Sequence, residues 1–285
     1  MQVQSDAPGA SVGIHDPHRG SLEVQAVARS DMGRKRRNNE DSYVVFDLSQ
    51  GLAHSDGISV QVDLGSPGLL LAVADGMGGH QSGEVASRLA VETLSKEVMK
   101  ALSEKQSEAT QTRVALTKCV EQTNKTIYEL AAGKPEYEGM GTTLTAALVR
   151  GTNVLVAQIG DSRAYLLHGE TLTQLTKDQT VKNSVLELQP DAVINENLGS
   201  MLAQALGVEP EVKVAITDAE LGQGDILLLC SDGLTKTVPT DDVARIARHG
   251  GTLKAKAETL IALANKAGGP DNVTVVLSTL RQKED

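Results

Sequence analysis

Aromatic residues and cysteines are scarce in this sequence of 285 residues. It contains no Trp, one Phe and four Tyr, which disfavours a surface that stacks single-stranded nucleic-acid bases and predicts a largely aliphatic core. The two cysteines, Cys119 and Cys230, are far apart, so they provide neither a disulfide framework nor a zinc site. We expect two reduced, buried thiols in a cytoplasmic protein.

Long hydrophobic runs are also missing. The longest lies near residues 69–74, far short of the roughly 18–20 residues that a membrane-spanning helix needs. The first 20 residues lack the basic-then-apolar order of a signal peptide and are rich in Gly, Pro, Ser, His and Asp. We therefore expect no membrane partner, and we expect residues 1–20 to be a flexible N-terminal arm.

Basic residues are outnumbered by acidic ones. The 27 Lys and Arg against 37 Asp and Glu give a net charge of −10, which disfavours nucleic acid as a partner because like charges repel. The surplus is compatible with a bound metal, a cationic partner or solubility alone. Hydrophobic residues make up 40% of the chain, which is typical of a globular protein. Because no linker interrupts residues 21–281, we expect a single domain there.

Hydrophobic periodicity predicts a succession of strands and helices. Apolar residues three or four positions apart, such as Val91, Leu94 and Val98, predict helices, and short apolar runs between turn residues predict strands. The predicted strands are 22–30, 42–47, 58–62, 69–74, 142–149, 154–159, 164–168, 172–175, 211–217, 226–230 and 272–280. The predicted helices are 82–102, 108–132, 240–248 and one that begins at Thr252, with short helical pieces near 184–188 and 200–206.

The order of these elements indicates an α+β fold. Helices occur in blocks instead of alternating with strands, and the short connections after residue 142 predict antiparallel pairing. Strands 69–74 and 226–230 are apolar on both faces, so both of their faces must be covered. We expect a four-layer α-β-β-α sandwich, in which two antiparallel sheets are flanked by helices.

Acidic residues occur repeatedly at the boundaries of the predicted strands. They are Asp75, Asp161, Asp232, Asp271 and the pair Glu40-Asp41. Each one alone is usually a turn residue, since Asp-Gly is a common turn dipeptide. The whole set is unusual, because several carboxylates at one edge of a sandwich would repel one another. Mg²⁺ and Mn²⁺ prefer such hard oxygen ligands, so the pattern indicates a divalent-metal site.

Six motifs carry a family resemblance that covers about residues 21–280. In chain order they are Arg36-x-x-x-Glu40-Asp41, Asp75-Gly76-Met77-Gly78-Gly79-His80, Gly141-Thr142-Thr143, Gly160-Asp161-Ser162-Arg163, Ser231-Asp232-Gly233-Leu234 and Gly269-Pro270-Asp271-Asn272. The set resembles the metal-dependent PPM phosphatases of the protein phosphatase 2C type, and the second motif is similar to the bacterial branch. The resemblance implies hydrolysis of phosphoserine and phosphothreonine on proteins by a metal-activated water at a binuclear Mn²⁺ or Mg²⁺ centre.

The resemblance also implies a role for each acidic residue. Asp75 would bridge both ions, the Gly76 carbonyl would bind the first ion, and Asp232 and Asp271 would bind the second. Glu40 would act through a water, and Asp41 would orient the ligands. In bacterial members a third, weaker ion uses the equivalent of Asp161 together with that of Asp232.

Arg36 resembles the arginine that grips the substrate phosphate, a role that suits a guanidinium because it binds two phosphate oxygens at once. Without the resemblance, a surface cation beside Arg34, Lys35 and Arg37 would be the simpler interpretation. Eukaryotic relatives have a His where this chain has Met77, so the general acid is not assigned. His80 need not replace it, and a metal-bound water could protonate the leaving group.

Two loops and two other functions remain open. Residues 176–210 correspond to the flap of the family, and the polar loop 50–67 could be a specificity element or a plain connection. The expected partners are phosphorylated proteins and a Ser/Thr kinase that the enzyme opposes, with no nucleic acid, and the chain is expected to be a monomer. A non-catalytic phosphate-binding sensor or scaffold on the same fold, and a hydrolase of small phosphate esters, are the alternatives.

Overall fold

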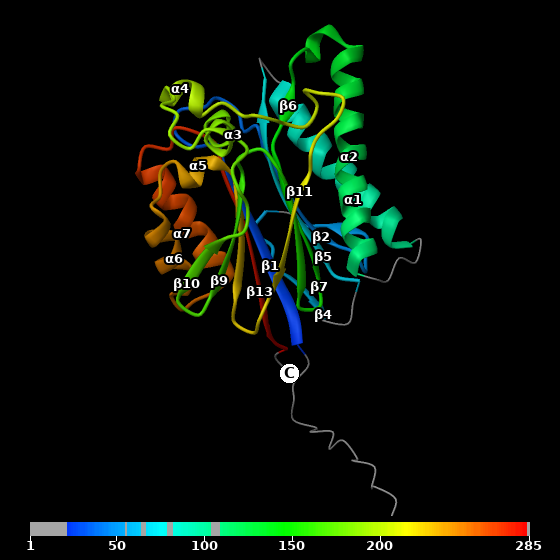
Figure 1. The fold of residues 1–285 in the computed structure, drawn as a ribbon. Helices are drawn as coiled ribbons and strands as arrows, with labels where there is room; N and C mark the ends of the chain where they lie inside the picture. Colours follow the sequence, from blue (N-terminus) through cyan, green and yellow to red (C-terminus); the bar gives the residue numbers. More distant parts are fainter. Residues whose placement is uncertain (1–21, 55, 64–66, 79–81, 104–108, 284–285) are drawn as a thin grey trace, which may run out of the picture.

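The computed structural model describes residues 22–54, 56–63, 67–78, 82–103 and 109–283, so the predicted arm and His80 lie outside the described residues. The chain forms two antiparallel sheets that stack face to face and are flanked by helices (Figure 1). The predicted α+β sandwich with layer order α-β-β-α is therefore confirmed.

The first sheet contains six strands. Their order is β10 (Thr171–Gln174), β9 (Arg163–His168), β12 (Ile226–Cys230), β13 (Val273–Gln282), β1 (Leu22–Asp31) and β4 (Val60–Asp63). Every pairing recorded in this sheet is antiparallel. Strands β1 and β13 pair over ten residues at its centre, from Leu22 opposite Gln282 to Asp31 opposite Val273. The N- and C-terminal strands of the fold are thus joined side by side.

The second sheet contains seven strands. Six follow the order β11 (Ala215–Glu220), β8 (Asn153–Ile159), β7 (Leu144–Arg150), β5 (Leu69–Met77), β2 (Asp41–Asp47) and β3 (Leu52–Ala53), and β6 (Gly141–Thr142) pairs with the end of β5. Helices α1 (Ser82–Ser103) and α2 (Ala109–Gly133) cover its outer face. A short 3₁₀ turn, Pro135–Tyr137, follows α2.

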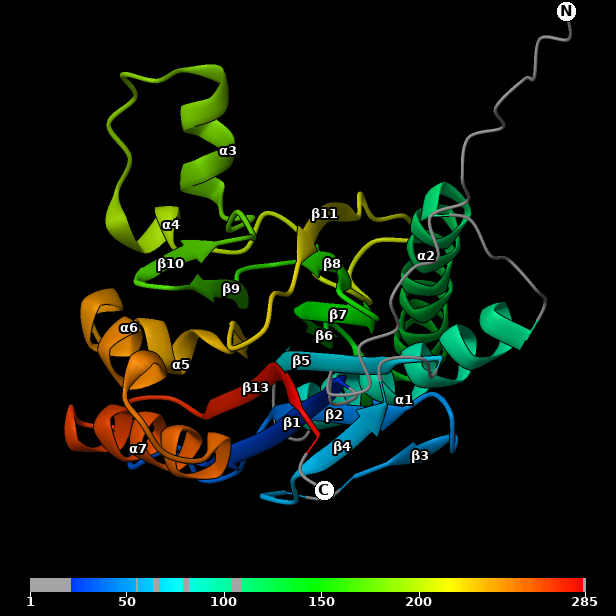
Figure 2. The same ribbon diagram turned by 90° about the horizontal axis from the view of Figure 1, so that it is seen from below.

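Helices α6 (Thr240–Arg248) and α7 (Leu253–Lys266) lie on the outside of the first sheet, opposite α1 and α2, as Figure 2 shows. Strand β5 explains why four layers form. Its Leu70 packs toward α1 and α2, while Leu69 and Leu71 pack between the two sheets. A strand that is apolar on both faces requires cover on both, and here the cover is a helix layer on one side and a sheet on the other.

Most predicted elements are present, and several differ in their bounds or their kind. Strand β5 continues to Met77 instead of ending at residue 74, because Gly76 and Met77 pair with β6. Residues 200–206 are not helical, because Leu206 exchanges both backbone hydrogen bonds with Thr142 and Leu202 pairs with Thr180. The strand predicted at 211–217 is β11, which begins at Ala215.

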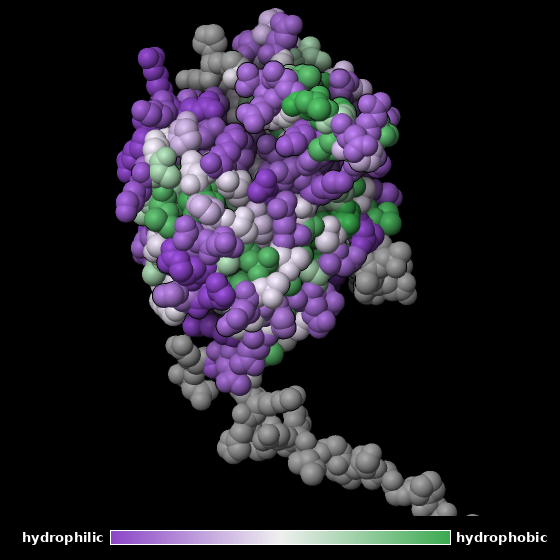
Figure 3. Space-filling model, turned by 60° about the vertical axis from the view of Figure 1, so that its left-hand side comes forward, coloured by the Kyte–Doolittle hydropathy of each residue, from purple (hydrophilic) through white to green (hydrophobic). Residues whose placement is uncertain are grey.

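Segment 176–210 contains two short helices, α3 (Val181–Leu188) and α4 (Glu196–Gly199). Its exposed large apolar side chains are Leu188, Val193, Leu198, Met201 and Val208. Elsewhere the surface is mixed, and the face in Figure 3 is mainly hydrophilic with small, separate hydrophobic patches. None of the helices in the described part of the chain combines the length and the hydropathy that crossing a bilayer requires.

Candidate functional site

The predicted acidic residues gather at one end of the sandwich, and both sheets supply them. Asp41 begins β2 and lies opposite Asp75 of β5 in the strand register. Asp232 follows β12 and begins a short helix, α5 (Asp232–Thr235), which the sequence analysis missed. Asp271 lies two residues before β13. In Figure 1 this end is marked by β6 and α5.

Two glycines allow the backbone segments to approach closely. A Cβ atom at Gly76 would lie 2.1 Å from the carbonyl oxygen of Gly83, at the start of α1. A Cβ atom at Gly233 would lie 1.9 Å from the carbonyl oxygen of Asn272. Any larger residue would clash, so these glycines hold Asp75 against α1 and Asp232 beside Asp271.

The carboxyl groups influence one another electrostatically. Burial raises the pKa of Asp75 well above its usual value, and the negative charges of Asp41, Asp232, Asp271 and Asp161 raise it further. The pKa of Asp161 is raised to about 6, mainly by burial and next by Asp232. Both effects disfavour the charged form. The cluster therefore needs cations in order to hold all of its charges.

The buried carboxyl group of Asp41 illustrates this need for a cation. Its Oδ2 accepts hydrogen bonds from Ser231 Oγ and Thr274 Oγ1, both at 2.7 Å. Its Oδ1 is buried and has no hydrogen-bond partner among the described residues, and the same holds for Oδ1 of Asp232. Buried polar atoms without a partner are costly. Two such oxygens beside an acidic cluster fit a divalent cation or the waters that it carries.

Glu40 and the Gly76 carbonyl occupy the same corner of the site. A methyl group at Gly83 would lie 3.1 Å from both the Glu40 carboxyl carbon and the Gly76 carbonyl oxygen. The backbone is fixed there, because Gly76 N–H donates to the Glu40 carbonyl at 3.0 Å and Glu40 N–H donates to Asn272 Oδ1 at 2.8 Å. The donor set is therefore made entirely of oxygens, which suits Mn²⁺ or Mg²⁺.

Asp161 is joined to Asp75 through hydroxyl groups. Thr143 Oγ1 accepts a hydrogen bond from Asp75 N–H at 2.9 Å and lies 2.8 Å from Ser162 Oγ. Directly after this turn, Arg163 donates two hydrogen bonds to the carboxylate of Asp178, at 2.8 and 2.6 Å. The Gly-Asp-Ser-Arg motif thus connects the acidic cluster to the start of segment 176–210.

Two cations of the chain itself already contact the acids. Arg36 pairs with Asp271 at 2.8 Å, and Lys236 pairs with Asp232 and lies 3.8 Å from Asp271. Within the part of the chain that the structure describes, no three His, Cys, Asp or Glu side chains already converge on a point that could hold a metal ion. No role was predicted for Lys236 from the sequence, although its position one helical turn after Asp232 indicates that the two side chains can pair.

Three supporting residues also lacked a predicted role. Ser231 and Asn272 belong to the quoted motifs, and Thr274 is the second residue of β13. Ser231 and Thr274 hold Asp41. Asn272 Nδ2 donates to the carbonyls of Met32 and Asn38 at 2.9 Å, which fastens the loop that carries Arg36.

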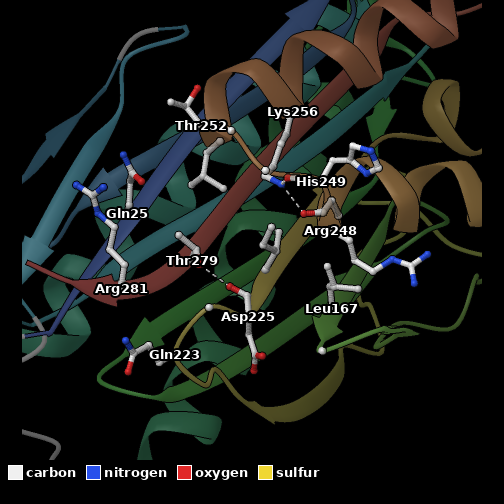
Figure 4. Close-up of a pocket in the computed structure, with 17 residues that line it drawn as sticks. Gln25, Leu167, Gln223, Asp225, Arg248, His249, Thr252, Lys256, Thr279 and Arg281 are labelled. Carbon is white, nitrogen blue, oxygen red and sulfur yellow. Dashed lines mark hydrogen bonds between the residues drawn. The ribbon is translucent and has the colours of Figure 1, made fainter.

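A cavity of about 760 Å³ lies away from these acids, between α6, α7 and strands β9, β12, β13 and β1 of the first sheet (Figure 4). Polar groups that line this cavity form hydrogen bonds with other groups of the protein. Lys256 Nζ donates to the carbonyls of Ala247 and His249, and the Asp225 carbonyl accepts from Thr279 Oγ1. The Asp225 carboxylate accepts from the Gly222 N–H. We therefore place the functional site at the acidic end and not in this cavity.

Comparison with known proteins identifies the fold family. The model of the family described as protein phosphatase 2C matches residues 47–267. The chain belongs to the protein phosphatase 2C family. It is 38% identical over 260 residues to the serine/threonine phosphatase stp of Listeria monocytogenes, which covers 89% of this chain and 95% of that protein.

A mycobacterial member of the protein phosphatase 2C family is similar in sequence and in structure. The serine/threonine protein phosphatase PstP of Mycobacterium tuberculosis is 36% identical over 263 residues, covering 91% of this chain and 46% of that protein. A crystal structure of the catalytic domain of PstP in complex with two manganese ions aligns with a TM-score of 0.71 at 36% identity, covering 92% of this chain and all of that one.

Proposed function

We propose that this chain is a protein serine/threonine phosphatase that hydrolyses phosphoserine and phosphothreonine with Mn²⁺ or Mg²⁺. The observation that carries the proposal is the acidic end of the sandwich, where clustered carboxylates include two buried oxygens, Oδ1 of Asp41 and of Asp232, that have no hydrogen-bond partner in the part of the chain that the structure describes. When bound, a pair of divalent ions supplies an activated water and offsets the negative charge of the phosphate. The enzyme opposes a Ser/Thr kinase.

The chain's own residues divide the work of holding the ions. Asp75 would be shared by two ions, since it lies opposite Asp41 and its pKa is raised by the charges of Asp232, Asp271 and Asp161. The Gly76 carbonyl would complete the first position, and Asp232 and Asp271 would form the second. Glu40 would contribute through a water, Asp41 would be a positioning residue, and Asp161 with Asp232 would form the third, weaker position.

Arg36 is the residue that we assign to phosphate binding. Its side chain is half exposed at the rim and contacts Asp271 at the same time. A guanidinium in this place can give two parallel hydrogen bonds to phosphate oxygens while it stays beside the acidic cluster. Met77, which pairs with Gly141 at the end of β5, has no proton to transfer. We therefore assign no side chain as the general acid, and we propose that a water protonates the leaving group.

The non-catalytic alternative predicts the loss of ion-binding carboxylates. Instead, Asp75, Asp232 and Asp271 are all present and lie at one end of the fold. A hydrolase of small phosphate esters would use the same ions, so only the substrate distinguishes it. The exposed apolar side chains of segment 176–210 support a protein substrate, because such side chains commonly mark protein-binding surfaces.

The test is hydrolysis of p-nitrophenyl phosphate and of a phosphothreonine peptide, with Mn²⁺ and then with excess EDTA. We expect turnover of both substrates with Mn²⁺ and none with EDTA. Asp75→Asn should abolish turnover, whereas Asp63→Asn at the other end of the sandwich should keep it. Full activity in EDTA or in Asp75→Asn would overturn the proposal. Hydrolysis of the nitrophenyl ester alone would favour the small-ester alternative.

The broader assignments follow from this function. We propose phosphorylated proteins and their kinase as partners, with neither nucleic acid nor membrane, and a cytoplasmic monomer with one catalytic domain at 21–281 and a flap at 176–210. Size-exclusion chromatography with light scattering tests the monomer, for which a mass near 30.0 kDa is expected. Residues 1–20 and the loop 50–67 are not assigned a role in catalysis.

A further inference from the structure

Lys236 is the residue on which this inference rests. It follows α5 directly, and its ammonium group pairs with Asp232 four residues earlier and lies 3.8 Å from Asp271. Both acids belong to the second ion position of the proposed function. Lys236 therefore contacts the same two carboxylates that a divalent ion would use there.

The position of Lys236 is imposed by the backbone. Gly233 lies against the Asn272 carbonyl, which fixes the start of α5 beside Asp271. The backbone N–H of Lys236 donates to the Asp232 carbonyl at 2.8 Å, which closes the helical turn. The ammonium group is thus tethered to the acidic end and cannot diffuse away, unlike a counter-ion from solvent.

The Lys236 side chain brings a positive charge to these acids. A lysine ammonium is charged at neutral pH, and the two groups that it faces here are both carboxylates. The side chain is still about half exposed, at 52%, which leaves it room to swing out when another cation arrives. Like charges at such a short separation repel strongly. The Lys236 ammonium and a divalent ion therefore cannot both contact Asp232 closely.

We propose that Lys236 is a built-in counter-cation that competes with the divalent ion for Asp232 and Asp271. It stabilises the acidic end when no metal is bound and lowers the affinity of the second ion position. The inference rests on the proposed function for the identity of the ion position. Arg36 differs, because it contacts Asp271 but is not recorded against Asp232.

The test measures Mn²⁺ binding directly. Full-length protein is stripped with EDTA and desalted, and free Mn²⁺ is followed by electron paramagnetic resonance during titration. Lys236→Met should tighten the weaker of the two principal Mn²⁺ sites by about tenfold, the equivalent of about 1.4 kcal/mol. Lys236→Gln is the second variant if Met disturbs folding, and Lys236→Arg should stay near wild type. Unchanged or weaker binding in both neutral variants would overturn the inference.

Lys283→Met is the matched control. Lys283 pairs with Asp63 at 2.9 Å and its side chain is 49% exposed, so the substitution removes the same charge from a lysine of similar exposure whose partner is a surface carboxylate. It lies beyond β13, at the end of the sandwich opposite α5 (Figure 1). We expect its Mn²⁺ affinity to match wild type. Equal tightening in Lys236→Met and Lys283→Met would assign the effect to net charge and overturn the inference.

A second measurement separates this inference from the function itself. In EDTA, Lys236→Met should unfold at a lower temperature than wild type, because the acids lose their counter-cation, and saturating Mn²⁺ should raise its Tm by more. A higher Tm in EDTA would contradict the inference. If wild type binds no Mn²⁺, the proposed function fails as well. If wild type binds and the variants bind equally, only the role of Lys236 fails.

Discussion

The Asp41 carboxyl is the most constrained polar group of the acidic end. Two hydroxyls hold one of its oxygens, and Thr274 also lies 2.7 Å from Ser30 Oγ. The group is 7% exposed, so neither oxygen can turn toward solvent without moving a strand. This rigidity is what a positioning residue requires, because a loosely held carboxylate would not orient the ligands of an ion.

Thr274→Val tests this hydroxyl. The substitution keeps the shape of the side chain but removes a donor to a buried carboxylate, so we expect the free energy of unfolding to fall by about 1–3 kcal/mol. Urea denaturation at pH 7 gives the measurement. Thr173→Val, at an exposed position of edge strand β10, is the control and should stay within about 0.5 kcal/mol. Equal stability of Thr274→Val and wild type would show that the hydroxyl contributes nothing.

The acidic residues that gather at one end of the sandwich could be singled out from the sequence, and their contacts could not. Asp75, Asp232 and Asp271 stand in recognisable motifs at strand boundaries. The hydrogen bond from Thr274 to Asp41 joins residues 233 positions apart, and it depends on how two sheets stack. No local pattern encodes that stacking. The contacts of Lys236 could not be predicted either, because α5 is a four-residue helix and is too short to show hydrophobic periodicity.

A buried lysine joins helices α6 and α7 beside their shared apolar cluster. Lys256 of α7 is 8% exposed, and it donates to carbonyls at the end of α6, including that of Ala247 at 2.6 Å (Figure 4). The last carbonyls of a helix lack partners within the helix and carry partial negative charge. A single ammonium group therefore completes α6 and joins it to the next helix.

Lys256→Met should lower the free energy of unfolding by about 1–3 kcal/mol, because several carbonyls lose their donor while the stem stays buried. Chemical denaturation followed by circular dichroism provides the value. Lys254→Met, two residues away on the exposed side of α7, is the matched control and should be nearly neutral. A neutral Lys256→Met would mean that water replaces the lysine without loss.

The long elements followed from local pattern, and the short ones did not. Strand 226–230 and helix 240–248 have the predicted bounds, because their apolar runs are bounded by turn residues or Pro. Residues 200–206 have helix-forming residues but pair with β6 and residue 180 instead. There, backbone pairing with distant segments overrides local propensity.

The whole molecule encloses both thiols. Cys119 and Cys230 are buried, and burial raises the pKa of Cys119 to about 11 and that of Cys230 to about 12. At pH 8 only about one Cys119 thiol in a thousand is then ionised, and the thiolate is the reactive form. Both thiols should be unreactive toward thiol reagents in the folded protein.

Ellman's reagent at pH 8 tests this protection. We expect almost no colour from the native protein and two equivalents of thiol after unfolding in guanidinium chloride. Because a raised pKa lowers the thiolate fraction, reaction should increase with pH only above about pH 10. Rapid stoichiometric reaction of the native protein would contradict the enclosed core.

The acidic end has a mechanical consequence for the sandwich. Asp75 belongs to one sheet and Asp232 lies just after β12 of the other, so an ion held by both would be a crosslink between the sheets, beside the hydrogen bonds that Ser231 and Thr274 donate to Asp41. In secreted proteins a disulfide serves this purpose, and here the two separate thiols form none. Chelation would thus unfasten the sandwich at one end only, and amide hydrogen exchange should accelerate there first.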